Sequence, residues 1–243
     1  DLIYLQPSPR WDEGIPLGNG DFGALVCGVN GARQEFFLDK TDLWFTQPEG
    51  QPIGRGYAAA LRVHFSGKHG KRQPFHQRLN LANATVETRD GDFRSRTFIH
   101  SRHNVMCVEV EAAAKLRIEL ERRPVQFGCG GLAWANGSWE NSGTTDPSEL
   151  DDLQERKRKI FAEMQKQPRS DVRYGALENA GWMLHALPNM SYAVALKVCG
   201  TARVARSFTK DRLTLSISIA RAPIRILVAI ATSRESADPV KHA

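Results

Sequence analysis

The stretch Phe93-Arg94-Ser95-Arg96-Thr97-Phe98-Ile99, followed by Val105-Met106-Cys107-Val108-Glu109-Val110-Glu111, alternates apolar or small residues with charged ones. A period of two residues is typical of a β-strand with one buried and one solvated face. Just before it, Asp90-Gly91 lies between two such runs and predicts a tight turn. This stretch therefore predicts antiparallel strands joined by short connections.

The same alternation extends in both directions along the chain. Upstream, residues 79–86 alternate approximately and predict a strand that runs up to the Asp90-Gly91 turn. Downstream, residues 116–120 alternate cleanly and predict the fourth strand of the same meander. Asn30-Gly31 separates two further apolar runs, at residues 24–29 and 34–38, and predicts a hairpin.

The second half of the chain adds more strands and one helix. Asp146 as a cap and Pro147 at the first helical position predict a helix over about 147–167, which Pro168 ends. Apolar runs predict strands at residues 182–187, 192–198, 201–204, 212–217 and 224–230. The predicted fold is mostly β: a large antiparallel β-supersandwich with one inserted helix, in a single domain over 1–243.

Composition narrows the class of protein. The chain has 243 residues, of which 41% are hydrophobic and 25% charged, as in an ordinary globular protein. No apolar run approaches the roughly 18 residues that a membrane helix needs, so we expect no membrane partner. Histidine and cysteine lack the spacings of known metal sites, and we expect neither a metal nor a cofactor.

The net charge of +6 belongs to one stretch. Residues 62–103 hold nine Lys and Arg against three acids, and the rest of the chain is neutral. Such a stretch is a common footprint of nucleic-acid or anionic-polymer binding. Here the basic residues alternate with core positions and do not cluster beside aromatic rings, which favours solvated strand faces over a nucleic-acid partner.

Two motifs bear on function. The residues Gly18-Asn19-Gly20-Asp21-Phe22-Gly23 match a dinucleotide-binding pattern, but a β-favouring run follows them instead of a helix. Asp39 and Asp42 precede Leu43-Trp44, and acids beside a Trp can hold a sugar through hydroxyl hydrogen bonds and ring stacking. An Asx-turn next to a core Trp is the structural alternative for that pair.

Two segments carry a resemblance to a known family. The stretch Trp11-Asp12-Glu13-Gly14-Ile15-Pro16-Leu17-Gly18-Asn19-Gly20-Asp21-Phe22-Gly23-Ala24-Leu25-Val26 resembles the opening motif of glycoside hydrolase family 95, which includes α-L-fucosidases. Leu38-Asp39-Lys40-Thr41-Asp42-Leu43-Trp44 is similar to the family's L-N-E-D-T-L-W, with Asp39 in place of Asn and Lys40-Thr41-Asp42 in place of Glu-Asp-Thr. Weaker similarities follow in the same order, at residues 77–86, 98–106 and 229–233.

The resemblance implies the N-terminal β-supersandwich domain of such an enzyme, related also to the N-terminal domains of family 65. In the family, this domain packs on an (α/α)6 barrel that carries the catalytic acid and base. We expect that barrel to lie outside these 243 residues, and therefore carry over no catalytic residue. The resemblance also favours an exported protein.

We therefore predict a non-catalytic module that supports a catalytic barrel and lines a sugar pocket. Its expected partners are the barrel of the same protein and an oligosaccharide. The expected substrate-binding residues are Asn19, Asp39, Asp42 and Trp44. The alternative is a free-standing β-sandwich that binds a glycan or an anionic polymer through residues 62–103.

Overall fold

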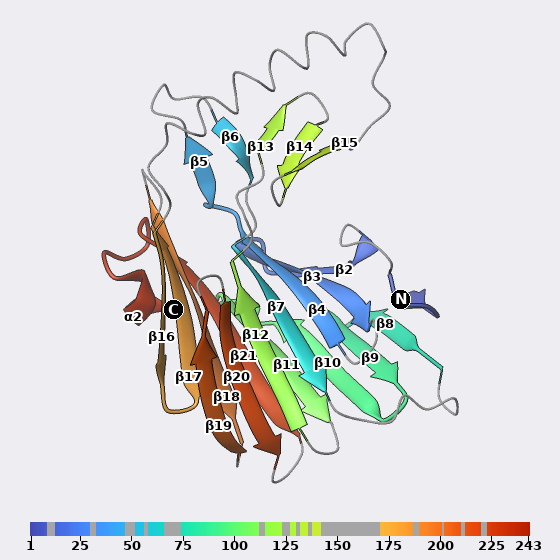
Figure 1. Ribbon diagram of the computed structural model, residues 1–243. Coiled ribbons are helices and arrows are strands. Elements are labelled where there is room, and N and C mark those ends of the chain that lie inside the picture. Colours follow the sequence, from blue (N-terminus) through green and yellow to red (C-terminus); the bar gives the residue numbers. More distant parts are fainter. Residues whose placement is uncertain are drawn as a thin grey trace, which may run out of the picture.

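A computed structural model shows two large antiparallel sheets packed face to face (Figure 1). It describes residues 1–8, 13–29, 33–46, 52–55, 58–65, 74–111, 115–122, 127–129, 132–135, 138–141, 171–186, 190–200, 202–209, 212–219 and 223–243. The mostly-β sandwich predicted from the sequence is confirmed. The helix predicted at 147–167 lies outside the described residues.

The larger sheet has nine strands and draws on both halves of the chain. Their spatial order is β1 (Leu2–Tyr4), β8 (His76–Asn80), β9 (Thr85–Asp90), β10 (Phe93–Ile99), β11 (Val105–Glu111), β21 (Ile224–Thr232), β18 (Ser191–Cys199), β17 (Ala180–Ala186) and β16 (Asp171–Leu177). Strands β8 to β11 are thus joined in one sheet with β21, which lies more than a hundred residues further along the chain. Val110 on β11, for example, pairs with Ile224 on β21.

The opposing sheet has seven strands. They are β19 (Ala202–Phe208), β20 (Arg212–Ile219), β12 (Lys115–Glu121), β7 (Ala59–Phe65), β4 (Arg33–Lys40), β3 (Phe22–Val29) and β2 (Ile15–Gly18). The predicted hairpin of residues 24–29 and 34–38 is the β3–β4 pair, in which Val29 faces Gln34.

Two sequence predictions about the meander were wrong. Residues 116–120 do not continue it, because β12 lies in the opposite sheet between β7 and β20. Residues 79–86 are not one strand, because a turn that exposes Leu81 separates β8 from β9. The Asn80 side chain accepts a hydrogen bond from the Ala82 N–H (3.0 Å), which stabilises that turn. The Asp90-Gly91 turn is confirmed, with Gly91 at a φ of +58°.

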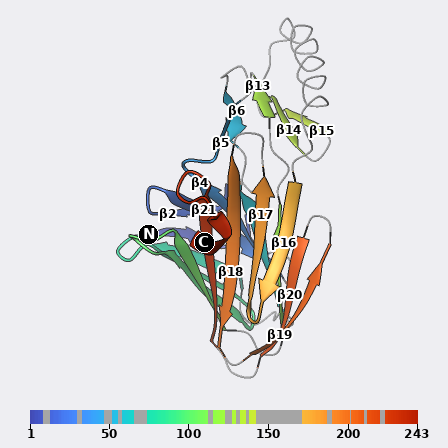
Figure 2. The same ribbon diagram turned by 90° about the vertical axis from the view of Figure 1, so that its left-hand side faces the viewer.

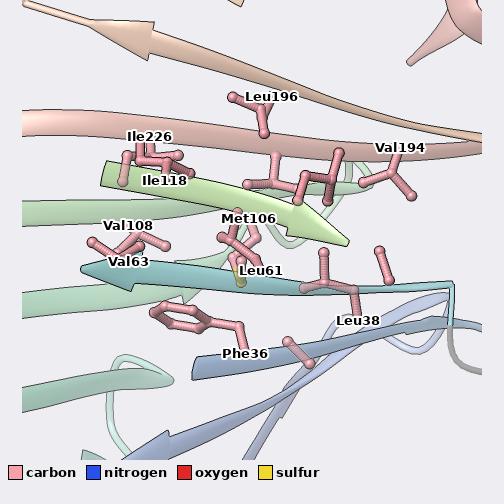
Figure 3. Close-up of a cluster of buried hydrophobic side chains, with 14 of the residues drawn as sticks. Phe36, Leu38, Leu61, Val63, Met106, Val108, Ile118, Val194, Leu196 and Ile226 are labelled. Atoms are coloured by element: carbon pink, nitrogen blue, oxygen red, sulfur yellow. The ribbon is translucent and has the colours of Figure 1, made fainter. Parts of the chain in front are cut away.

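The core fills the space between the two sheets (Figure 3). Phe36, Leu61 and Ile118 extend into it from the seven-stranded sheet and meet Met106 and Ile226 from the nine-stranded sheet. Along β10, buried side chains alternate with exposed ones, as the sequence predicted.

Two small sheets lie beyond one end of the sandwich, in both views of the molecule (Figures 1 and 2). One pairs β5 (Trp44–Thr46) with β6 (Pro52–Arg55), and the other joins β13 (Phe127–Cys129), β14 (Leu132–Ala135) and β15 (Ser138–Asn141). The chain finishes in a short helix, α2 (Pro239–His242), which packs on β17, β18 and β21. Among the described residues, none of the helical structure is long and apolar enough to cross a membrane.

Candidate functional site

A buried lysine lies at the end of the sandwich from which β5 and β6 project. Lys40 is the last residue of β4 and is 3% exposed. Its ammonium group contacts three carboxylates: Asp21 at 2.9 Å, Asp42 at 3.0 Å and Glu235 at 3.1 Å. An ammonium has three N–H donors, so each carboxylate can take one. Together with Thr232, these residues form what we call the Lys40 cluster.

The fold brings the Lys40 cluster together from three distant segments. Asp21 lies in the β2–β3 turn, Asp42 in the turn after β4, and Glu235 just beyond β21. Thr232, the last residue of β21, donates from its Oγ1 to Asp42 Oδ2 (2.5 Å), and its own N–H donates to Glu235 Oε2 (2.9 Å). The cluster therefore fixes the segment that leaves the last strand.

The charges of the cluster stabilise one another. Burial alone would raise the pKa of Asp21, but hydrogen bonds from Thr41, Lys40 and Asn104 outweigh it and hold that pKa below its usual value of 3.8. Burial alone would lower the pKa of Lys40, but hydrogen bonds to Asp21, Asp42 and Glu235 outweigh it and raise that pKa above 10.5. Asp21 and Lys40 are thus both charged at neutral pH.

Asn19 connects the two sheets to each other at this end of the sandwich. Its Nδ2 donates to the carbonyl oxygens of His100 and His103, each at 3.1 Å, in the β10–β11 loop. Its Oδ1 accepts from the N–H groups of Asp21 (3.0 Å) and Phe22 (2.8 Å). These bonds use both donors of the amide and both lone pairs of its oxygen. In this structure Asn19 positions the β2–β3 turn.

The Gly-rich motif that contains Asn19 forms a hairpin. A short strand, β2, precedes it and β3 follows it in place of a helix, so a dinucleotide-binding turn is absent here. Gly20 has a φ of +93°, a conformation that favours glycine.

Asp39 contacts the backbone of Lys40. Asp39 is half-buried and stands on the opposite face of β4 from Lys40, since neighbouring strand residues alternate between faces. Its Oδ1 accepts a hydrogen bond from the Lys40 N–H (2.8 Å). Trp44 begins β5, and its side chain lies outside the described residues. Of the predicted residues whose side chains the structure describes, Asp42 joins the cluster directly, Asn19 joins it through the Asp21 turn, and Asp39 bonds to the Lys40 backbone.

A second buried polar group lies beside the cluster. Tyr192 on β18 is the register neighbour of both Thr232 and His185. Its hydroxyl donates to the Ala58 carbonyl oxygen (2.9 Å) and lies 2.8 Å from His185 Nδ1. The hydroxyl has one proton, which it donates to Ala58. The hydrogen bond between the hydroxyl oxygen and His185 is therefore donated by His185 Nδ1–H. Burial raises the pKa of Tyr192 far above its usual value.

Chemically, the Lys40 end presents acids that are fixed and partly open to solvent. The side chains of Asp42 and Glu235 are 23% and 26% exposed, and that of Asp21 is 42% exposed. Carboxylates held in this way can accept hydrogen bonds from hydroxyl groups of a ligand. Within the described part of the chain, no group of three or more His, Cys, Asp or Glu side chains could hold a metal ion.

Sequence reasoning missed Lys40, Asp21 and Glu235 as members of this site. One signal was present: Gln34, Phe36, Leu38 and Lys40 share one parity of β4, so the alternation that buries Phe36 and Leu38 also buries Lys40. No pattern in the sequence pointed to Glu235, because its place depends on β21 lying opposite β4.

The described basic residues of the stretch 62–103 lie on more than one surface. Arg62 lies on the outer face of the seven-stranded sheet and pairs with Glu35 (2.7 Å) and with Glu121. Arg94 and Arg96 lie on the outer face of the nine-stranded sheet, where Arg94 pairs in register with Glu111. The charge is thus divided between opposite faces and interleaved with acids.

Comparisons with known proteins identify a family. A search of the curated proteins finds no match. Residues 3–144 match the model of one family, the N-terminal domain of DUF5703, which is described as a domain of unknown function. The match covers more than half of the chain and includes the β2–β3 turn, the end of β4 and the β10–β11 loop. This protein therefore belongs to the DUF5703 N-terminal domain family.

Proposed function

We propose that this chain is the N-terminal β-sandwich module of a glycoside hydrolase that resembles family 95. In this proposal its Lys40 end packs beside an (α/α)6 catalytic barrel and lends polar side chains to the rim of the sugar pocket. The hydrolysis itself, by a general acid and a water-activating base, belongs to the barrel.

One observation carries the proposal: the segments that bear the resemblance meet at one end of the sandwich. Asn19 and Asp21 come from the opening motif, and Lys40 and Asp42 come from the second motif. Hydrogen bonds and ion pairs join them to one another and to Glu235 beyond the last strand. A rigid, partly exposed polar end of this kind suits a face that holds a neighbouring domain and a sugar.

Within this site, the residues divide by what their polar atoms already contact. Asn19 has its amide filled by protein partners and acts as a positioning residue. Asp42 is partly exposed, and each of its oxygens retains a lone pair beyond its bond to Lys40 or Thr232. Asp42 is therefore the acceptor that we expect to meet a sugar hydroxyl, and Trp44 is the expected stacking platform.

A calorimetric titration of the protein with fucosylated and galactosylated oligosaccharides tests the pocket. We expect Trp44→Ala to weaken binding about tenfold, because an aromatic platform contributes roughly 1–2 kcal/mol. Trp182→Ala is the control, since Trp182 lies on the outer face of the nine-stranded sheet, over Gly175 of the neighbouring strand β16. Equal losses in the two variants, or no binding by the wild type, would remove the sugar site from the proposal.

The reading frame of the source gene tests the domain partner. We expect it to continue past residue 243 into several hundred residues of paired amphipathic helices. A stop codon directly after this segment would overturn the module proposal and favour the free-standing sandwich. Glycosidase activity in the 243-residue chain would contradict our assignment of the acid and base to the barrel.

A further inference from the structure

A second polar surface lies at the opposite end of the sandwich from the Lys40 cluster. There the outer face of the seven-stranded sheet carries a hollow of about 590 Å³, near the edge strand β19. The residues that line it come from β7, β12, β19 and β20. We call it the β19 hollow.

The register of these four strands explains the shape of the hollow. Two rows of register partners cross these strands with their side chains on the outer face. One row consists of His64, Arg117, Ser216 and Ala205, and the other consists of Lys115, Ser218 and Arg203. The row between them, from Phe65 to Val204, turns its side chains toward the core. Its peptide groups therefore form the floor.

Side-chain size gives the hollow its walls. Ser216, Ser218 and Ala205 are short and lie in the middle or at the edge of the rows. The long cations Lys115 and Arg117 stand on one side of the serines, and Arg203 stands on the other. Two hydroxyl groups on the floor are thus flanked by three positive charges.

The hollow has a basic lining. No Asp or Glu is among the described residues that line it. Arg203 is exposed and forms no ion pair with any residue that the structure describes. The nearest acid, Glu119, is buried and already binds His64 (2.9 Å), Arg212 (3.2 Å) and Arg117 (3.4 Å).

The contacts of Arg117 also hold its guanidinium group in place. Arg117 Nη2 lies 3.3 Å from His64 Nδ1, and His64 Nε2 donates to the acceptor-only carboxylate of Glu119 (2.9 Å). His64 is therefore the neutral Nε2–H tautomer, whose Nδ1 accepts from Arg117. An arginine fixed in this way loses less conformational freedom when it binds an anion.

A hollow on the other large sheet provides the contrast. It is lined by Arg89, Arg94 and Arg96, but also by Glu87, Glu109 and Glu111, so positive and negative charges alternate across it. The arginines of this hollow therefore have acids as neighbours. The β19 hollow is different because serine and alanine occupy the places of the acids.

From this geometry we infer that the β19 hollow binds an oxyanion, namely a sulfate or carboxylate group of a soluble ligand such as an acidic sugar. Arg117 and Arg203 would contact the anion from opposite sides, and Ser216 and Ser218 would donate from the floor. The outer rows contain no Phe, Tyr or Trp among the described residues, and the His64 ring already contacts Arg117 and Glu119, which disfavours a nucleic acid. This inference does not depend on the proposed function at the Lys40 end.

A titration followed by NMR tests the inference. Backbone amide shifts of the 243-residue protein are recorded with sodium sulfate at constant ionic strength, and then with a sulfated and a uronate oligosaccharide. We expect saturable shifts confined to β12, β19 and β20. The two oligosaccharides separate a sulfate ester from a carboxylate as the group that binds. Tighter binding of single-stranded DNA than of either oligosaccharide would overturn the assignment.

Two variants distinguish a specific anion-binding site from non-specific attraction by positive charge. Arg203→Gln should weaken sulfate binding about fivefold to tenfold, as expected for the loss of one charge-assisted contact at a partly solvated site. Arg206→Gln is the matched control, because it removes the same charge from the same strand but on the other face. Equal losses in both variants would contradict the site.

A third variant tests the shape alone. Ser218→Leu fills the floor without changing the charge, at an exposed strand position where the protein should still fold. We expect it to abolish the saturable shifts. Unchanged sulfate binding in this variant would show that the anion does not enter the hollow.

Discussion

The two ends of the sandwich use charge in opposite ways. At the Lys40 end, one buried cation is surrounded by three acids, and every donor of its ammonium group has a partner. In the β19 hollow, three exposed cations surround two serines, and no Asp or Glu is among the described residues that line it. Charges that are buried and paired fix the structure, whereas an exposed cation such as Arg203, which forms no ion pair with the described residues, remains available to a ligand.

The largest expected effect is the loss of the buried cation. Lys40→Met should lower the free energy of unfolding by about 3 kcal/mol at pH 7, because three carboxylates would face one another without their partner. Urea denaturation measures it, with Lys197→Met on the exposed face of β18 as the control. Equal stability of the two variants would mean that the Lys40 cluster does not stabilise this end.

The effect of Lys40→Met on stability should depend on pH. The lowered pKa of Asp21 contributes stability above its usual value of 3.8, and that contribution is lost as the pH falls through the folded-state pKa. The raised pKa of Lys40 contributes stability below 10.5, which is lost only at higher pH. The difference between wild type and Lys40→Met should therefore be constant between about pH 5 and 9 and shrink below about pH 4.

The next effect concerns the amide that joins the two sheets. Asn19→Ala should cost about 2 kcal/mol, because two loop carbonyls and two turn N–H groups lose their partner together. Asn80→Ala is the matched control, since the Asn80 side chain accepts one hydrogen bond within a single turn. A cost no larger than the control's would show that Asn19 is not needed to position the β2–β3 turn.

A pH-dependent effect is expected next to the β19 hollow. Burial lowers the pKa of His64, and Arg117 and Arg33 lower it further, which outweighs the opposite effect of Glu119. Because the unfolded chain binds this proton more tightly, the contribution of His64 is present above pH 6.5 and is lost as the pH falls through its folded-state pKa. Thermal unfolding of His64→Gln should therefore depend less on pH between about 5 and 7 than that of the wild type. An identical pH profile would refute the neutral tautomer.

The smallest effect on stability is expected in the hollow itself. Arg203→Gln should change the free energy of unfolding by less than about 0.5 kcal/mol, because exposed charges contribute little to stability. Chemical denaturation measures this change. A large loss of stability would place Arg203 in the folded framework and remove the contrast between the two ends.

The sequence was a good guide to local structure. Alternation identified β10 and β11, apolar runs identified most later strands, and Asn30-Gly31 and Asp90-Gly91 marked two hairpins. It failed where a choice between sheets was needed. The pattern of residues 116–120 would suit either sheet, and pairing with residues 60–65 and 212–218 decided its place.

The residues of the candidate site also differ in whether the sequence could reveal them. Asn19 and Asp42 could be selected from motifs because both lie in turns with recognisable composition. Glu235 and Thr232 could not, because their contacts join residues 190 positions apart in the chain. Likewise, residues 62–103 read as one basic segment, whereas the fold sends Arg62 and Arg96 to opposite faces of the molecule.

The sequence by itself determined the strands, the turns and which side of each strand is buried, since these follow from short-range alternation and turn chemistry. Only the tertiary structure decided which strands are neighbours, and therefore which charges meet. Lys40 finds its acids and Arg203 lacks them because long-range pairing placed acids around the first and serines around the second.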